Sequence, residues 1–535
     1  MASSIGRSSA ILASGTVVSR VLGFAKAWLL LQAIGSIGFG ADAYATSTIV
    51  PNSIYAIVAQ GILNAVLVPQ IVRASSHPDG GRSYINKLTT VGIVLFAVLA
   101  AVATILAGPL MHLFGVDPKA EALATAFAYW SLPQIFFLGL YTLLGEALNA
   151  RKSFGPFTWA PVLNNIVAIV LLAVFISAFH ADPAGQRPVD SWTPSMVALL
   201  AGGATLGMAA QAIILFFFWR KVGLKFRLDF RWRGVNLGYA GRAAAWTFAM
   251  LICQQIAGLI QTNVSNSASG HNASTQVLST AWLIFMLPHS IIAVSIVTAY
   301  YTRMSEHAHR EDIVSFRADF SAALRTISML IVFSAAALIV VAYPFARIFT
   351  PHYTQMGNVL IAYLLGLLPY TILFMTQRAF YAISDTVTPF LFTLAQVAIV
   401  IGGSLSCLAL PSSIRAIGIA TTVSVATIVQ TFIGVQLLRR RIGGIDGRRS
   451  LASIWRFLLA GALSAVVGVA VLIGLGGTYR GGFAVSGLVP AFVSIAIVGL
   501  VMLGMYFTVL ALLRSQEFIG TLRPVVARLR ALVGR

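Results

Sequence analysis

The sequence predicts an all-α polytopic membrane protein with fourteen transmembrane helices, in which two six-helix lobes form a parallel pseudo-twofold repeat and two further helices follow. The composition, the spacing of the charged residues and an internal repeat predict this fold class. Of the 535 residues, 58% are apolar and only 10% are charged, whereas a soluble domain carries about 25% charged residues. This composition excludes a soluble enzyme with a polar surface.

Long windows without Asp, Glu, Lys or Arg mark the spans, because a helix that crosses a bilayer needs about 20 mainly apolar residues. The first span, 9–36, is apolar except for Arg20 and Lys26. The 60-residue window 243–302 is too long for one helix and is broken by a polar stretch, Asn263 to Asn272, so we expect two helices there. The other expected spans lie, in chain order, in the windows 43–72, 88–116, 122–145, 153–181, 191–219, 326–346, 348–377, 386–414, 416–438, 457–479 and 481–513.

The basic residues predict the orientation, since Lys and Arg are retained in short cytoplasmic loops. Fourteen spans place both termini on one side. If that side is the cytoplasm, 25 of the 36 Lys and Arg residues lie in cytoplasmic segments. The net charge of +21 is therefore mostly a consequence of topology. It argues against nucleic-acid binding and makes anionic membrane lipids the expected partner of these loops.

An internal repeat divides the chain. The segment Pro51 to Ala56 resembles Pro288 to Ala293 at an offset of 237, and the segment that begins at Ala147 resembles the one at Ala379 at an offset of about 232. Both matches shift the chain by six expected helices, which preserves orientation and is typical of parallel repeats. We therefore predict an N-lobe at 1–236, a C-lobe at 237–445, and a last part at 446–535 with the two additional helices and a basic tail.

Candidate gate or hinge residues lie at corresponding places of the two halves. Pro51 and Pro288 each remove a backbone hydrogen bond inside a span, which suits either a hinge or ordinary bundle packing. Glu146 and Arg378 lie at the cytoplasmic ends of the fourth and tenth expected helices, where they could form a latch or simply be interfacial charges. Asp385 precedes a Thr-Val-Thr-Pro turn, where it could cap the next helix or coordinate an ion.

Charged residues inside spans are the strongest functional signal, because an ionised side chain at the bilayer centre costs about 2.5 to 3.5 kcal/mol on insertion scales. Arg20 lies about 15 Å along the first helix, near the membrane centre, and Lys26 lies about 9 Å further. Lys26 could instead extend to the outer interface. Asp42, which follows a Gly-rich turn, is the nearest acid in sequence and could neutralise one of the two cations.

Catalytic chemistry has no support in the sequence. The two cysteines, Cys253 and Cys407, lie in apolar runs without metal-ligand spacing, and no nucleotide-binding or catalytic-triad motif is recognisable. We expect no enzyme activity, no metal and no cofactor, so that transport would depend on a monovalent cation or on the membrane potential. A cationic cavity with few acids suits an anionic cargo, because Arg and Lys bind phosphate oxygens.

Several motifs resemble the MurJ (MviN) family of lipid II flippases in the MOP exporter superfamily. The likeness begins in the first helix and covers nearly the whole chain. The matching segments are Ser19–Lys26, Gly40–Tyr44, Pro51-Asn52, Gly61, Val68-Pro69, Ala147–Ala150 with Phe154, Ala160–Asn164, Leu287-Pro288, Arg378–Ala382, Asp385-Thr386 and Thr388-Pro389.

The resemblance implies that the chain moves lipid II, an undecaprenyl-pyrophosphate-linked peptidoglycan precursor, from the inner to the outer leaflet of the bacterial plasma membrane. It implies that the cations of the first helix bind pyrophosphate, and that a groove beside the last two helices holds the lipid tail. The expected substrate-binding residues are Arg20, Lys26, Asp42, Asn52, Tyr55 and Gln60. Four positions depart from the family pattern. Lys26 stands where the family has an Arg, and Tyr55 stands where it has a basic residue. Gln60 stands where the family has an acid, and Leu283 stands where it has an Arg.

Two other functions remain open. A MATE-like multidrug exporter, or an exporter of another lipid-linked polysaccharide, would share the fold, but a drug exporter usually needs cavity acids and few are present. A membrane scaffold that recruits cell-wall synthesis proteins through its basic loops would not need Arg20 within a span. We therefore expect a multi-pass flippase with both termini in the cytoplasm, a role in cell-wall biogenesis and cell shape, and lipid II as its partner.

Overall fold

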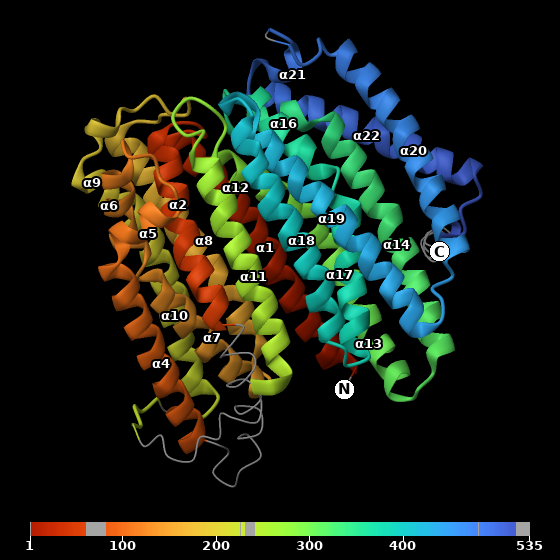
Figure 1. Ribbon diagram of the computed structural model, residues 1–535, viewed down its shortest axis with the longest axis horizontal. Coiled ribbons are helices and arrows are strands. Elements are labelled where there is room, and N and C mark those ends of the chain that lie inside the picture. The colour runs from red at the N-terminus through yellow and green to blue at the C-terminus, as the bar shows by residue number, and fades with distance from the viewer. Residues whose placement is uncertain (1, 60–81, 225, 231–240, 480, 521–535) are drawn as a thin grey trace. The chain divides into compact units, whose positions relative to one another are not determined.

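The computed structural model describes residues 2–59, 82–224, 226–230, 241–479 and 481–520, which form helices and connecting loops without a strand among them (Figure 1). The chain divides into two compact units, Met1–Gln276 and Val277–Arg535. The lobe boundary that we predict at residues 236 and 237 lies outside the described residues. The contacts instead group the helix that ends at Asn266 with the first unit.

The first unit contains the helices expected from the first seven spans. Several expected spans are broken into consecutive helices, as at Leu132-Pro133, where a proline prevents continuous helical hydrogen bonding. The elements are α1 (Ala2–Ile34), α2 (Phe39–Val58), α4 (Arg82–Ile105), α5 (Ala107–Leu113), α6 (Glu121–Ser131), α7 (Gln134–Ala150), α8 (Phe154–Phe179), η2 (Val189–Ser191), α9 (Pro194–Val197), η3 (Ala198–Gly202), α10 (Gly203–Lys221) and α11 (Gly241–Asn266).

The second unit contains the remaining elements. Most of α12 belongs to it, and the gap between α11 and α12 falls in the polar stretch where the long uncharged window was expected to break. The elements are α12 (Thr275–Pro288), η4 (His289–Ala293), α13 (Val294–His309), α14 (Ile313–Val340), α15 (Ala342–Phe349), α16 (Tyr353–Leu364), α17 (Leu367–Ala382), α18 (Val387–Ser406), η5 (Cys407–Ala409), α19 (Ser412–Ile442), α20 (Gly447–Gly474), α21 (Phe483–Ser486) and α22 (Leu488–Leu512).

The protein is an all-α, multi-pass membrane protein. Among the described residues, 11 helices are long and apolar enough to cross a membrane, or 12 if α16 and α17, bent by 42° at their junction, form one span. The two expected spans outside this set correspond to α2 and α11, which have 20 and 26 residues and carry several polar side chains. At 1.5 Å per residue they are about 30 and 39 Å long, so their length suits a membrane crossing. The count of fourteen stays a prediction.

The helices α7 and α17 end with the same backbone motif, which also occurs at Glu311 and Arg514. After α7, Lys152 adopts a left-handed φ of 60°, and after α17, Ser384 does the same at 59°. In both places the following N–H donates to a carbonyl five residues earlier, from Ser153 to Leu148 and from Asp385 to Phe380. This pattern ends a helix with a Schellman motif. The two motifs are separated by the offset of 232 residues that the sequence comparison indicates.

The expected span 326–346 is corrected by the structure, because α14 begins much earlier, at Ile313. Its amino-terminal half carries Asp319 and Arg325, both buried, so the uncharged window marks only part of the helix. Each of these charges has an ion-pair partner within the second unit. A rule that ends a span at the first charge fails where the charge is paired.

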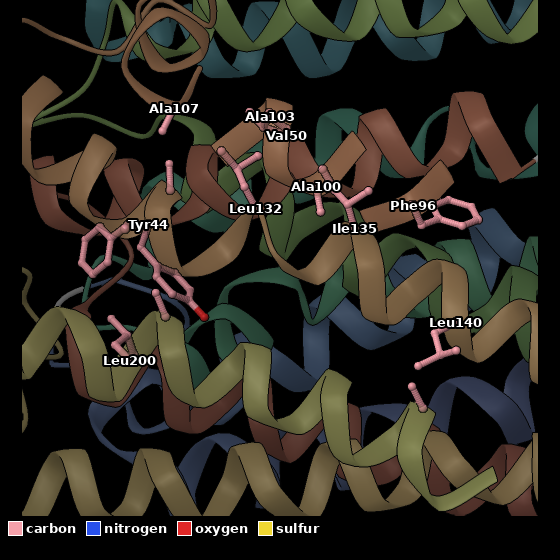
Figure 2. Close-up of a cluster of buried hydrophobic side chains, with 14 of the residues drawn as sticks. Tyr44, Val50, Phe96, Ala100, Ala103, Ala107, Leu132, Ile135, Leu140 and Leu200 are labelled. Atoms are coloured by element: carbon pink, nitrogen blue, oxygen red, sulfur yellow. The ribbon is translucent and has the colours of Figure 1, made fainter. Parts of the chain in front are cut away.

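The core of the first unit joins α2, α4, α6, α7 and α10. Figure 2 shows part of this cluster, with Phe96 of α4 and Leu140 of α7 among its large side chains. Small residues permit the close packing: a Cβ on Gly139 would lie 2.2 Å from the ring of Phe96. Trp219 of α10 is buried and donates its ring N–H to the carbonyl of Leu144. The buried surface thus fixes the helices that carry the candidate site.

The loop after α8 packs against the Gly-rich turn between α1 and α2. Gly185 has a left-handed φ of 67°, and a Cβ there would lie 1.8 Å from the carbonyl oxygen of Ile37. Asp182 fixes the same loop, because its N–H donates to the carbonyl of Gln32 and its carboxylate accepts from the N–H groups of Gln186 and Arg187. The turn that leads from the first helix into the second is therefore held by backbone contact.

We expect Gly185→Ala to lower the free energy of unfolding by about 2 kcal/mol or more, because the new methyl group meets a backbone atom and must adopt a left-handed φ. Gly499→Ala is the matched control, since a Cβ there meets nothing within 4 Å. Thermal unfolding of the purified variants in detergent measures both. Equal midpoints for the two variants would contradict the close approach of Gly185 to Ile37.

Candidate functional site

Arg20 lies on the part of α1 that packs along α8. Its side chain is partly buried, and the helix pair is among the most extensive contacts of the first unit. Asn165 of α8 donates its side-chain N–H to the carbonyl of Ser19 over 2.8 Å. This polar contact joins α1 to α8 directly beside Arg20.

Lys26 lines a small cavity inside the first unit. The cavity has a volume of about 20 Å³, which suits about one water molecule. The side chain of Tyr44 lines it as well, with Leu200 nearby, and Figure 2 shows these last two close together. The other lining residues are apolar or glycine and come from α1, α8, η3 and α10. The hypothesis that Lys26 binds substrate stays a prediction.

Asp42 is buried at the start of α2 and holds the segment between α11 and α12. Its carboxylate accepts a hydrogen bond from Ser269 Oγ over 2.6 Å and one from the Gln276 N–H over 3.0 Å. One turn later Thr46 contacts Asn266, whose side-chain N–H also donates to the carbonyl of Phe114. The described contacts of Asp42 are therefore those of a residue that orders a loop, and its assignment to the substrate site rests on sequence alone.

The other predicted residues of α2 face different surroundings. Asn52 is exposed and donates to the carbonyl of Thr48 over 2.7 Å. Tyr55 pairs its hydroxyl with Thr142 Oγ1 of α7 over 2.5 Å, and Glu146 lies nearby on the same helix. Gln60, and the family-like Gly61, Val68 and Pro69, lie outside the described residues. The structure thus brings Tyr55 and Glu146 together at one end of α2 and α7.

In the second unit, Pro288 ends α12 and is followed at once by the π-helical turn η4. Such turns are rare and occur often at functional sites. His289, the first residue of the turn, is buried, contacts the rings of Tyr370 and Phe374 at 4.8 and 5.1 Å, and shares a hydrogen bond with Thr371 over 3.2 Å. Pro288 therefore lies at a real irregularity, and its hinge role stays a prediction.

Arg378 lies four residues before the end of α17, which is Ala382. Its guanidinium stacks on the rings of Tyr301 and Phe374, with centroid distances of 5.5 and 5.3 Å. Arg–aromatic stacking of this kind is attractive and holds the guanidinium plane in place. Arg378 thus joins α13 to α17, and the proposed latch with Glu146 remains untested.

Asp385 makes the hydrogen bonds of a capping residue. Its carboxylate accepts from the N–H groups of Val387 and Thr388 over 3.1 and 3.0 Å, and from the hydroxyl of Thr388 over 2.7 Å. These bonds satisfy free donors in the first turn of α18. They support the capping interpretation that the sequence left open against ion coordination.

Two charged clusters of the second unit were not predicted from the sequence. In one, Arg303 pairs with the buried Asp319 over 2.6 Å, and His307 lies 3.4 Å from the same carboxylate. In the other, Arg325 of α14 pairs with Glu517, beyond α22, over 2.8 Å. Arg325 lies just before the expected span 326–346, and sequence alone cannot identify an acid almost two hundred residues away as its partner.

A family model and several known proteins that match this chain carry the same description. The family model described as "Lipid II flippase MurJ" matches residues 33–492. A probable lipid II flippase MurJ from Rickettsia prowazekii is 24% identical over 443 residues, covering 78% of this chain and 81% of the relative. A lipid II flippase MurJ from Burkholderia cenocepacia is 27% identical over 395 residues, covering 70% and 72%.

The fold agrees with solved transporter structures. The chain superimposes on a lipid II flippase MurJ in an inward closed conformation with a TM-score of 0.70 and 19% identity, covering 94% of this chain and 99% of the other. It also superimposes on an inward-facing multidrug resistance MATE family transporter of the MOP superfamily with a TM-score of 0.64 and 18% identity, covering 80% and 95%. At these identities the structural likeness concerns the fold alone.

Proposed function

The chain belongs to the lipid II flippase MurJ family, and from this premise we propose that it moves lipid II from the inner to the outer leaflet of the bacterial plasma membrane by alternating access. The match of the family model over residues 33–492 carries the proposal. The reaction is translocation without bond breaking, so the protein is a transporter and not an enzyme. Its role in peptidoglycan synthesis follows from its substrate.

Arg20 is the residue proposed to bind the pyrophosphate of lipid II. A guanidinium matches phosphate oxygens with a planar pair of donors and keeps its charge at all physiological pH values. The position of Arg20 within a membrane-spanning helix supports this role, because a cation there is costly unless it serves a partner or a polar cavity. Lys26, Asn52, Tyr55 and Gln60 are proposed as further contacts, and Asp42 as a residue that orders the nearby loop.

The orientation in the membrane and the energy source of transport are also proposed. Both termini and the basic loops face the cytoplasm, where the loops contact anionic lipids, and cell-wall synthesis proteins are candidate partners. Movement is coupled to a monovalent cation or to the membrane potential. Pro51 and Pro288, with Glu146, Arg378 and Asp385, belong to the gates that open alternately.

A multidrug exporter is the second candidate, and the MATE-like fold favours it. Cationic drugs need an acid in the cavity. Asp42, the acid nearest in sequence to the two cations of α1, accepts hydrogen bonds from Ser269 and Gln276. The flippase proposal therefore agrees better with the charges of α1 and α2.

Depletion of the protein in its own host tests the function directly. We expect lipid II to accumulate on the cytoplasmic face, shown by resistance to a lipid II-cleaving enzyme added outside the cell. A cell depleted of an unrelated membrane protein of similar abundance is the control. If lipid II remained accessible from outside after depletion, the flippase proposal would be contradicted.

A further inference from the structure

The cytoplasmic end of α10 leads into an irregular segment, residues 226–230, which carries exposed apolar side chains. Phe226, Leu228 and Phe230 are 36, 55 and 62% exposed. They alternate with Arg227 and Asp229. This alternation is the pattern that places apolar side chains on one face wherever the backbone is extended.

The segment is fixed against the start of α4 through its backbone. The N–H of Arg227 donates to Asn86 Oδ1 over 3.4 Å, and the N–H of Asp229 donates to Thr90 Oγ1 over 2.9 Å. Bonds from every second residue are typical of extended backbone. The side chains of α4 thus satisfy backbone donors that hydrocarbon would leave unpaired.

These contacts place the segment at one end of α4. The candidate span of this helix begins at Ser83 and carries Lys87 near its start, between Asn86 and Thr90. Basic and aromatic residues at the end of a span are typical of the membrane interface, where amphipathic segments bury their apolar face. We therefore expect the exposed faces of Leu228 and Phe230 to meet the interfacial region of the lipid.

Aromatic and basic groups complete the surface. The ring of Phe226 packs against those of Phe216 and Trp219 at 5.2 and 6.1 Å, which joins the segment to the end of α10. Arg220, Lys221 and Arg227 are exposed. Three cations beside one acid, Asp229, attract anionic headgroups of a cytoplasmic leaflet, while aromatic rings prefer the interface.

We propose that residues 226–230 form a membrane-surface anchor, in which Phe226, Leu228 and Phe230 enter the cytoplasmic leaflet and Arg220, Lys221 and Arg227 bind the headgroups of anionic phospholipids. The proposal rests on the cytoplasmic placement given under the proposed function, and it does not depend on the cargo. The insertion of the segment can therefore be tested in vesicles without lipid II. A negative result there leaves the flippase proposal intact, and a negative flippase assay leaves the anchor proposal intact.

Spin labels test the insertion. In full-length protein with Cys253→Ala and Cys407→Ala, single labels are placed by Leu228→Cys, Phe230→Cys and, as the control, Arg310→Cys in the exposed loop after α13. In vesicles of phosphatidylcholine with phosphatidylglycerol, we expect oxygen to relax the labels at 228 and 230 more than a water-soluble nickel complex does, and the reverse at 310. Labels at 228 and 230 that are as accessible to nickel as the one at 310 would overturn the proposal.

A charge variant tests the headgroup contact. We expect the combination Arg220→Gln, Lys221→Gln and Arg227→Gln to remove at least half of the thermal stabilisation that phosphatidylglycerol gives the wild type over phosphatidylcholine. Lys119→Gln, an exposed cation elsewhere in the first unit, is the control and should leave that stabilisation unchanged. An undiminished effect of phosphatidylglycerol on the triple variant would contradict the assignment of these three cations.

Discussion

Arg20→Ala is expected to abolish lipid II translocation while the protein still inserts into the membrane at wild-type levels. A hydrogen-bonded contact to a charged group contributes about 1.5 to 3 kcal/mol, so its loss alone lowers substrate affinity on the order of 10- to 100-fold. Arg20→Lys should retain part of the activity, because an ammonium keeps the charge but loses the planar pair of donors. The measurement is growth of a strain that carries only the variant allele.

The control for this prediction is Lys119→Ala, which removes an exposed cation from the loop between α5 and α6. Membrane levels of each variant are compared by immunoblotting, so that lost insertion is not read as lost transport. Normal growth with Arg20→Ala as the sole copy would remove the physical basis for pyrophosphate binding at this residue.

Glu517→Gln is expected to lower the free energy of unfolding by about 3 kcal/mol, because it leaves the charge of Arg325 buried without its counter-ion. Both side chains are only 10% exposed and their nearest atoms lie 2.8 Å apart. Ser453 and Ser515 donate to the same carboxylate over 3.2 and 3.0 Å. The pair joins α14 and α20 to the segment after α22, so its loss should loosen these elements together.

The double variant Arg325→Met with Glu517→Leu is the control. Replacing both members of a buried pair by apolar residues of similar volume is often neutral or stabilising. Equilibrium unfolding in mixed micelles should therefore place the double variant near the wild type. If Glu517→Gln also unfolded like the wild type, the pair would have no role in stability.

The same pair gives a pH dependence. Burial raises the pKa of Glu517, but hydrogen bonds from its own backbone N–H, Ser515 and Ser453, with the charge of Arg325, outweigh burial and place the pKa below its ordinary value. A carboxyl with a lowered folded pKa stabilises the protein fully above its unfolded pKa, about 4.3. That contribution is lost as the pH falls through the folded pKa. The wild type should therefore lose this part of its free energy of unfolding at low pH, and the double variant should not.

The sequence predicted the fold class because the membrane imposes simple rules of length and charge. The break of the window 243–302 was predicted within Asn263 to Asn272, and α11 ends at Asn266 while α12 begins at Thr275. Polar side chains there cannot face lipid, and they contact Asp42, Thr46 and each other instead. The left-handed turns after α7 and α17 lie 232 residues apart, which agrees with the offset of the predicted repeat.

The candidate site was harder to predict, because its contacts join residues far apart in the chain. Asp42 was proposed to neutralise a cation of α1 because it is the nearest acid in sequence, and the sequence did not indicate that it accepts hydrogen bonds from Ser269 and Gln276. Lys26 and Arg20 share a helix, yet only Lys26 lines the cavity with Tyr44. A pattern can place a charge in a span, and only tertiary packing determines which partner it meets.

Translocation by the purified protein tests the central claim most directly. Full-length protein is reconstituted into vesicles that contain fluorescent lipid II, and a membrane-impermeant quencher reports the fraction of label on the outside over time. We expect lipid II to move between leaflets at a rate that depends on the amount of protein, well above that of empty vesicles and of vesicles with Arg20→Ala. Movement no faster than in empty vesicles would contradict the flippase proposal.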